Sequence, residues 1–259
     1  IYLIAQAFCG SHSAVWIPTF SEYADACRLH GHRVEGISSL EKLTGNEGIF
    51  WLCNPNNPTG QTWDAATLRR LIATYPRKLF VIDQSYALFT EKKVLSVAET
   101  VKLPNVLLLH SMTKCYAVPG LRLGAVTGSR ELLSRIRACR MPWSVNALAV
   151  EAGHYLLQHP GEYRMDIQAL LTERRRVTDA LEALGGVEVL PTDTHYFLAR
   201  LQQGTAAQLK EFLATRHGLL IRDASNFEGL DARYFRIAIQ TEEENNLLIE
   251  GIHEWIQNS

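Results

Sequence analysis

The sequence predicts an α/β protein in which a large domain with a mainly parallel central sheet is followed by a smaller C-terminal α+β domain. Over the first 110 residues, apolar segments of strand length alternate with amphipathic segments of helix length, which is the pattern of βαβ units. Two segments, Phe80–Asp83 and Val106–His110, are apolar at nearly every position. Strands covered on both faces have this composition, so we expect both to be central.

The spacing of apolar residues along the chain predicts the helices and strands of the large domain. The run Ile1–Phe8 is apolar and helix-like, but neither an initiating Met nor a capping residue precedes it, so we expect a further segment upstream of Ile1. After it we predict a strand over His12–Ile17, a helix over Tyr23–His30, a strand over Gly48–Leu52, a helix over Asp64–Tyr75, and strands over Lys78–Asp83 and Val106–His110.

The pattern turns helical between Val145 and about Leu184, where the charged stretch Glu173–Arg176 is best explained as a solvated helix face. We place the domain boundary there, with residues 1–155 in the large domain and residues 156–259 in the smaller one. The smaller domain is predicted to contain strands at Val187–Leu190, Tyr196–Leu201, Leu219–Asp223 and Tyr234–Ile239, and helices at Ala206–His217 and Glu242–Ile256.

Composition excludes several classes of protein. The 26 Lys and Arg residues balance 27 Asp and Glu residues, for a net charge of -1, so no overall field favours nucleic acid or an anionic membrane. The five cysteines are odd in number and lack metal-ligand spacing, which argues against a bound metal and for a reducing cytoplasm. No apolar run reaches about 18 residues, so we expect no membrane span.

Polar residues stand where three of the apolar strands end, which is where open α/β sheets bind their ligands. The turn-rich octet Cys53–Gly60 follows the first of these strands, Asp83–Tyr86 (DQSY) the second, and Ser111–Lys114 (SMTK) the third. Alone, each has an ordinary explanation as a turn, a helix cap or a solvated lysine. Together they supply the parts of a pyridoxal 5′-phosphate (PLP) site.

The two groups that such a site needs most are an amine and a carboxylate. Lys114 can form the Schiff base with the cofactor, a covalent role for which lysine is suited. Asp83 can pair with the pyridine nitrogen and keep it protonated, which makes the ring an electron sink.

The remaining groups would orient the cofactor. Asn57 and the Tyr86 hydroxyl can donate hydrogen bonds to the ring oxygen. Ser111 and Arg122 can hold the cofactor phosphate, the arginine through charge-assisted hydrogen bonds.

Four segments, NPNNPTG, DQSY, SMTKCYAVPGLRLG and YFRIAIQ, resemble the motif series of fold-type I PLP enzymes, which have the aspartate-aminotransferase-like fold. The similarity is greatest to the histidinol-phosphate aminotransferase branch. Within that branch, the segments Arg140–Ala149, Ile221–Arg222 and Arg233–Arg236 look most like L-threonine O-3-phosphate decarboxylases of cobalamin biosynthesis. The resemblance spans essentially the whole chain.

The resemblance implies further roles. Phe20 corresponds to an aromatic residue stacked on the cofactor ring, although a core aromatic is the alternative. Arg222 and Arg236 match two arginines that bind anionic groups of the substrate, and Asn57 is implied at the substrate as well as at the cofactor. A structural ion pair of these arginines with Asp223 or Asp231 is the other reading, because a buried guanidinium needs a partner.

This chain departs from the family pattern at a few positions. Gln84 and Ser85 stand where Glu and Ala are frequent, Cys115 follows the lysine, and Ala125 replaces a frequent aromatic. The glycine-rich turn that gives backbone N–H groups to the cofactor phosphate is expected before Ile1.

The leading expectation is therefore PLP-dependent decarboxylation of L-threonine O-3-phosphate to aminopropanol phosphate by a cytoplasmic homodimer, with a small phosphorylated amino acid as its substrate. Transamination of the histidinol-phosphate type is the close alternative, because it uses the same lysine, aspartate, asparagine and tyrosine. A noncatalytic binding protein is disfavoured, since every visible catalytic position is occupied.

Overall fold

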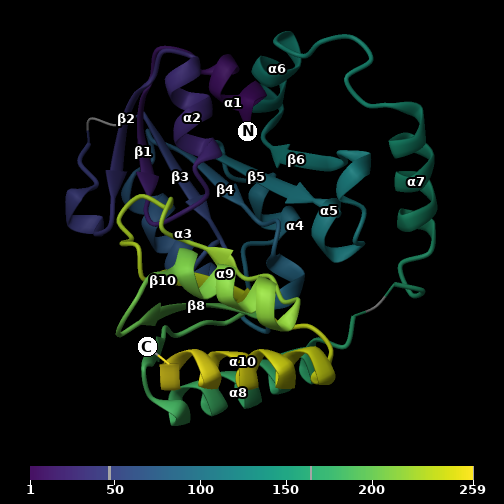
Figure 1. Ribbon diagram of the computed structural model, residues 1–259. Helices are drawn as coiled ribbons and strands as arrows, with labels where there is room; N and C mark the ends of the chain where they lie inside the picture. The colour runs from purple at the N-terminus through teal and green to yellow at the C-terminus, as the bar shows by residue number, and fades with distance from the viewer. Residues whose placement is uncertain (46–47, 164, 259) are drawn as a thin grey trace.

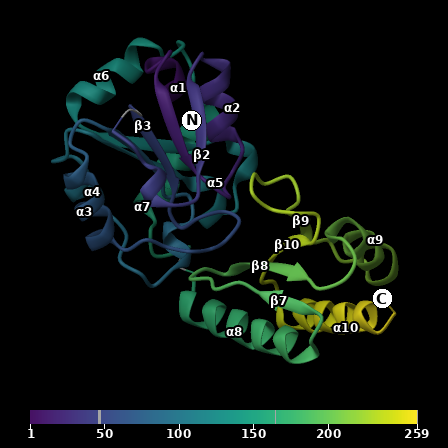
Figure 2. The same ribbon diagram turned by 90° about the vertical axis from the view of Figure 1, so that its left-hand side faces the viewer.

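The computed structural model describes residues 1–45, 48–163 and 165–258 and contains two sheets (Figures 1 and 2). The first has six strands in the order β2-β1-β3-β4-β5-β6, and all neighbours are parallel except the β5–β6 pair. Its strands are β1 (His12–Trp16), β2 (Arg33–Ile37), β3 (Ile49–Cys53), β4 (Leu79–Asp83), β5 (Val106–Ser111) and β6 (Gly124–Gly128). The predicted α/β class with a mainly parallel sheet is confirmed.

The central strands β3 and β4 are buried at every position, because helices cover both faces of the sheet. One face packs on α1 (Tyr2–Ala7), α2 (Glu22–Leu29) and α6 (Arg130–Ala138), and the other on α3 (Ala65–Thr74). Strand side chains alternate between these faces: Trp51, Cys53 and Val81 belong to the α1–α2 side, and Phe50, Leu52, Phe80 and Ile82 to the α3 side.

The second sheet is antiparallel and runs in the order β7-β8-β10-β9. Its strands are β7 (Val187–Val189), β8 (Tyr196–Leu201), β9 (Arg222–Asp223) and β10 (Tyr234–Ala238). Helices α8 (Ile167–Leu184), α9 (Ala206–His217) and α10 (Glu242–Asn258) pack on it around a separate apolar cluster. Figure 2 shows this part lying below the first sheet.

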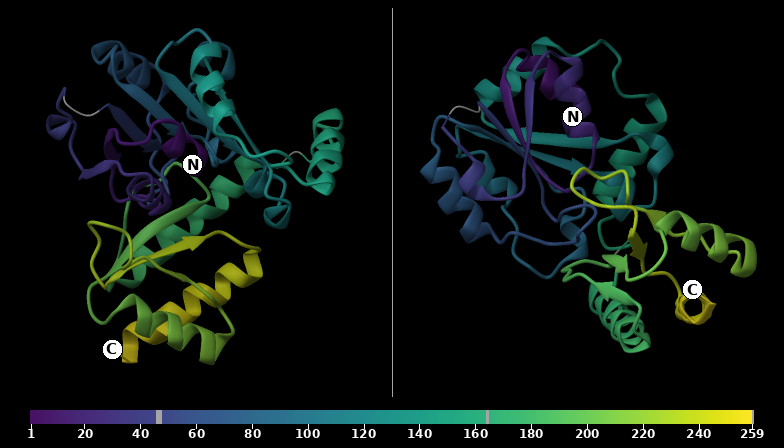
Figure 3. Two further views of the ribbon diagram at one scale, coloured as in Figure 1. Left: turned by 90° about the horizontal axis from the view of Figure 1, so that it is seen from above. Right: turned by 60° about the vertical axis from the view of Figure 1, so that its left-hand side comes forward.

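Helix α7 (Ala147–Gln158) links the two parts and stands apart from both sheets in Figures 1 and 3. The predicted boundary between residues 155 and 156 falls inside this helix. The short helical elements are α4 (Val97–Thr100), α5 (Met112–Cys115), η1 (Leu40–Lys42), η2 (Ala87–Phe89) and η3 (Pro119–Leu121).

Most predicted elements of the first 110 residues are confirmed to within one residue at each end, and Asp64 caps α3 by accepting a hydrogen bond from the Thr67 amide. The helical run from Val145 is divided into α7 and α8. The strand predicted over Leu219–Asp223 is limited to β9, which has two residues. Strands β2 and β6 have no counterpart in the prediction, because β2 is a polar edge strand and β6 carries glycine at both ends.

No helix among the described residues is long and apolar enough to cross a membrane.

Candidate active site

A cavity of about 460 Å³ opens where β3, β4 and β5 end, and this size suits a small-molecule ligand. It brings together residues that lie far apart in the sequence. The sequence-predicted residues that line it are Phe20, Asn57, Asp83, Tyr86, Ser111, Lys114 and Arg122. The parallel arrangement of the strands explains this, because their carboxyl ends meet at one edge of the sheet.

The Asp83 carboxylate is buried and held by three donors. Its Oδ2 accepts from the Tyr23 hydroxyl at 2.8 Å, and its Oδ1 accepts from the Ser85 amide at 2.9 Å and the Ser85 hydroxyl at 2.6 Å. Burial, together with the charge of Asp83, raises the pKa of Tyr23 well above its usual value. Tyr23 therefore remains a neutral donor, and the carboxylate has one fixed orientation.

Lys114 presents a free amine at this cavity. It lies on α5, directly after β5, and its side chain is exposed. Within residues 1–45, 48–163 and 165–258, its Nζ has no hydrogen bond or ion pair, and it stands 6.0 Å from the centroid of the Tyr86 ring. An unpaired amine beside a buried carboxylate is suited to covalent capture of a carbonyl ligand.

Two hydroxyl groups and a guanidinium group also line the cavity. Ser111 Oγ lies 2.7 Å from Thr113 Oγ1 and accepts a hydrogen bond from the Thr113 amide at 3.2 Å. Arg122 adopts a left-handed backbone conformation with φ of 56° and donates to the Pro119 carbonyl at 2.8 Å. Two hydroxyls and one guanidinium form a set of donors suited to a phosphate.

Arg236, on β10 of the second sheet, does not line this cavity, but it contacts Asn57, which does. Its Nη1 donates a hydrogen bond to Asn57 Oδ1, and its guanidinium carbon lies 5.4 Å from the centroid of the Tyr196 ring. Burial raises the pKa of Tyr86, and the Arg236 charge opposes that change. Among the described residues, none accepts a hydrogen bond from the buried Arg236 Nε, so the guanidinium retains an unmet donor.

Arg222 lies opposite Arg236 on the neighbouring antiparallel strand. It does not line the first cavity; both arginines line a second hollow of about 350 Å³. Like charges directly across a strand pair repel one another. The two arginines therefore create a local demand for an anion.

The ion pairs considered from the sequence do not satisfy this demand. Arg222 donates to Asn226 Oδ1 at 2.9 Å, whereas Asp231 pairs with Arg233 and Arg200. Among the described residues, neither Asp223 nor Asp231 forms an ion pair with Arg222.

Sequence reasoning missed three residues near the cavity. Tyr23 follows Phe20 by three positions, a helical spacing that could have placed the two together; their rings meet edge to face at 5.9 Å. Cys53 ends β3 on the same face as Asp83, and burial raises its pKa to about 12. Burial and the charges of Arg236 and Lys114 lower the pKa of His195 to about 4, and nothing in the sequence around His195 indicates that position.

Comparison with known proteins identifies the family of this chain. Over residues 1–252 the sequence matches the family described as aminotransferase class I and II. The chain belongs to this family. Class I and II aminotransferases and their decarboxylase relatives depend on PLP.

Three relatives show where the chain lies within the class I and II aminotransferase family. A solved L-threonine-O-3-phosphate decarboxylase from Porphyromonas gingivalis is 40% identical, with a TM-score of 0.96, over 99% of this chain and 80% of that one. A threonine-phosphate decarboxylase from Salmonella typhimurium is 31% identical over 97% of this chain and 73% of that protein. A histidinol-phosphate aminotransferase from Desulfitobacterium hafniense is 30% identical over 98% of this chain and 74% of that protein.

These findings confirm the resemblance and the aspartate-aminotransferase-like fold that the motifs indicated. The described residues also fit the family's cofactor. The cavity offers a free amine at Lys114, a fixed carboxylate at Asp83, and a hydroxyl and guanidinium set for a phosphate. No group of three or more His, Cys, Asp or Glu side chains able to hold a metal occurs among the described residues.

Proposed function

We propose that this protein is a PLP-dependent decarboxylase that converts L-threonine O-3-phosphate to aminopropanol phosphate in cobalamin biosynthesis. The observation that carries the proposal is the opposed pair Arg222 and Arg236, next to a cavity that presents the free amine of Lys114. A substrate with both a carboxylate and a phosphate supplies the anions that two guanidinium groups require. Similarity to threonine-phosphate decarboxylases selects the reaction.

The cofactor would be held from the first sheet. Lys114 would bind it covalently, Asp83 would pair with its pyridine nitrogen, and Phe20 would stack on its ring. Tyr86 would donate to the ring oxygen. Asn57 would do the same through its amide nitrogen, because its Oδ1 already accepts from Arg236.

Ser111 and Arg122, joined by Thr113, would bind the cofactor phosphate. Arg122 keeps donors for this purpose, since the described structure records a single bond from it, to the Pro119 carbonyl. Thr113 lines the cavity and shares its hydrogen bond with Ser111.

When bound, PLP supplies an electron sink for the electrons left at Cα after CO2 departs. The contribution of the chain is orientation and proton transfer. Arg236 and Arg222 would bind the anionic groups of the substrate and so select which Cα bond is broken. The Lys114 amine would deliver a proton to Cα.

Transamination is the second candidate function, since it needs the same residues and the chain is 30% identical to a histidinol-phosphate aminotransferase. The two reactions differ in which Cα bond is perpendicular to the ring. The test is incubation of the full-length protein and PLP with L-threonine O-3-phosphate. Release of CO2 with aminopropanol phosphate supports decarboxylation. Keto-acid formation supports transamination. If the protein turns over neither this substrate nor histidinol phosphate, the result supports a binding protein.

We also propose a cytoplasmic homodimer. Four large apolar side chains around α7 are 70% or more exposed: Met141, Trp143, Leu148 and Leu157. Exposed apolar surface of this kind marks an interface, and a second copy is its proposed partner. The cytoplasmic assignment is supported by five cysteines that are all free. Sedimentation of the full-length protein and of Leu148→Asp tests the dimer, which the variant should weaken.

A further inference from the structure

The loop that carries Asn57 is fastened to the second sheet at several points. The Tyr196 hydroxyl donates to the Asn56 carbonyl at 2.9 Å, and the Asp193 amide donates to the Gly60 carbonyl at 3.0 Å. Gly60 has φ of +72°, and a Cβ there would collide with Thr192 and lie 2.9 Å from the Tyr196 carbonyl oxygen. Only glycine permits this close approach, so the loop is seated tightly on the segment that leads into β8.

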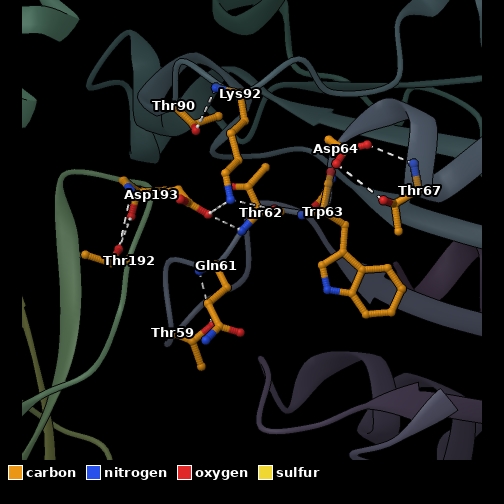
Figure 4. A network of polar contacts seen from close by, with 12 residues as sticks. Thr59, Gln61, Thr62, Trp63, Asp64, Thr67, Thr90, Lys92, Thr192 and Asp193 are labelled. Carbon is orange, nitrogen blue, oxygen red and sulfur yellow. Dashed lines mark hydrogen bonds and ion pairs between the residues drawn. The ribbon is translucent and has the colours of Figure 1, made fainter. Parts of the chain in front are cut away.

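Asp193 joins this segment to a third part of the chain (Figure 4). Its Oδ2 accepts from the Thr62 amide at 2.8 Å and from Lys92 Nζ at 2.8 Å. In Figure 4, Lys92 extends toward both Asp193 and Thr62, whereas Asp64 points away to Thr67. One carboxylate oxygen thus connects the Asn57 loop, the segment after η2 and the entry to the second sheet; we call Thr62, Lys92 and Asp193 the clasp.

The clasp acts on the position of Arg236. Asp193 leads into β8, and β8 pairs with β10, where Arg236 faces Leu198. Arg236 in turn donates to Asn57 Oδ1. The sheet that carries the guanidinium and the loop that receives it are therefore fixed to each other by the clasp, away from the cavity itself.

Three of the cofactor-side groups do not depend on this connection, whereas Asn57 lies on the loop that the clasp holds. Asp83, Ser111 and Lys114 lie at the ends of β4 and β5 of the first sheet or directly after them. Loosening the clasp should move Arg236 relative to Lys114 while leaving Asp83, Ser111 and Lys114 in place.

We propose that Asp193 and Lys92 are positioning residues that set the distance between the substrate-binding end of the site and the cofactor-binding end. The proposal rests on the proposed function for its substrate. Asp193 also acts on Arg174 of α8. Burial lowers the pKa of Arg174, and the negative charge of Asp193 partly offsets that change. Lys92 is nevertheless the cation that the structure records in an ion pair with Asp193.

The test compares Lys92→Met with a matched ion-pair variant. In the Lys92–Asp193 pair the side chains are 49% and 25% exposed, and the nitrogen lies 2.8 Å from the oxygen. In the Arg176–Glu173 pair within α8 they are 40% and 21% exposed, and this distance is 2.7 Å. The second pair lies within one helix, and the hydrogen bond that Glu173 accepts from Asn245 of α10 at 2.8 Å is left in place by Arg176→Met. In the full-length enzyme with PLP, Lys92→Met should raise KM for L-threonine O-3-phosphate about two- to fivefold, the scale of an exposed ion pair, with the cofactor absorbance unchanged.

Two further variants sharpen the result. Lys92→Arg should restore KM to within about twofold of the parent, since it keeps the charge. Asp193→Ala should raise KM on the order of tenfold, because it also leaves the Thr62 amide without its acceptor. A Lys92→Met variant that matches Arg176→Met in KM, or that loses kcat and PLP binding equally, overturns the proposal.

Hydrogen exchange provides a readout that needs no substrate. In Lys92→Met, amides in residues 60–64 and 192–196 should exchange faster than in the parent or in Arg176→Met, because Asp193, which accepts from the Thr62 amide, is no longer held by Lys92. Unchanged exchange would overturn the clasp whatever the enzyme's substrate. Faster exchange without decarboxylation would count against the proposed function alone and would support the clasp.

Discussion

Replacing Tyr23 with phenylalanine should destabilise the cofactor-free protein by about 1.5–2 kcal/mol. Tyr23 is 2% exposed, and the change removes its hydroxyl, which donates a hydrogen bond to Asp83 at 2.8 Å. A hydrogen bond to a charged group contributes about 1.5–3 kcal/mol. The lower part of that range applies because Ser85 still gives Asp83 two donors. The ring and its stacking on Trp51 remain, so no cavity term is added.

Thermal unfolding measures this effect. For a chain of this size each kcal/mol lowers Tm by about 2–4 °C, so Tm should fall by about 3–8 °C. Tyr75→Phe is the control, because the Tyr75 hydroxyl donates to the neutral Leu43 carbonyl at 3.2 Å and should contribute only about 0.5–1 kcal/mol. If Tyr23→Phe lowers Tm no more than the control does, the Tyr23–Asp83 bond does not fix the carboxylate as we argue.

Three further predictions concern the site. Lys114→Ala should abolish covalent attachment of PLP, so that borohydride reduction followed by mass spectrometry finds no adduct; an adduct would refute the assignment. Arg222→Lys and Arg236→Lys should each weaken binding of L-threonine O-3-phosphate by about 1–3 kcal/mol with the cofactor absorbance unchanged, and normal KM in both would contradict their role. His195, whose pKa is lowered to about 4, contributes stability that is present above about pH 6.5 and lost as pH falls toward 4, because the unfolded chain then binds a proton that the folded one excludes. His195→Gln should remove roughly 3 kcal/mol of that acid sensitivity in urea unfolding between pH 7 and pH 4.

The residues at the strand ends were predictable because their placement depends on local pattern and on one general rule. Asp83 and Lys114 follow continuous apolar runs, and parallel strands bring their carboxyl ends to one edge of the sheet. Hydrophobic period alone then determined most elements of the first 110 residues. It did not reveal β2 or β6, since an edge strand with polar residues and a strand flanked by glycines lack that period.

Long-range contacts were decided by the tertiary structure. Tyr23 and Asp83 are 60 residues apart, Asn57 and Arg236 are 179 apart, and Lys92 and Asp193 are 101 apart. No local propensity encodes such pairs, because each depends on how separately formed elements pack.

The sequence by itself therefore determined the class of fold, the order of the chemical groups and the family to which they belong. Only the folded chain placed Arg222 opposite Arg236 and apart from the first cavity, because strand register is fixed by side-chain packing across the whole sheet.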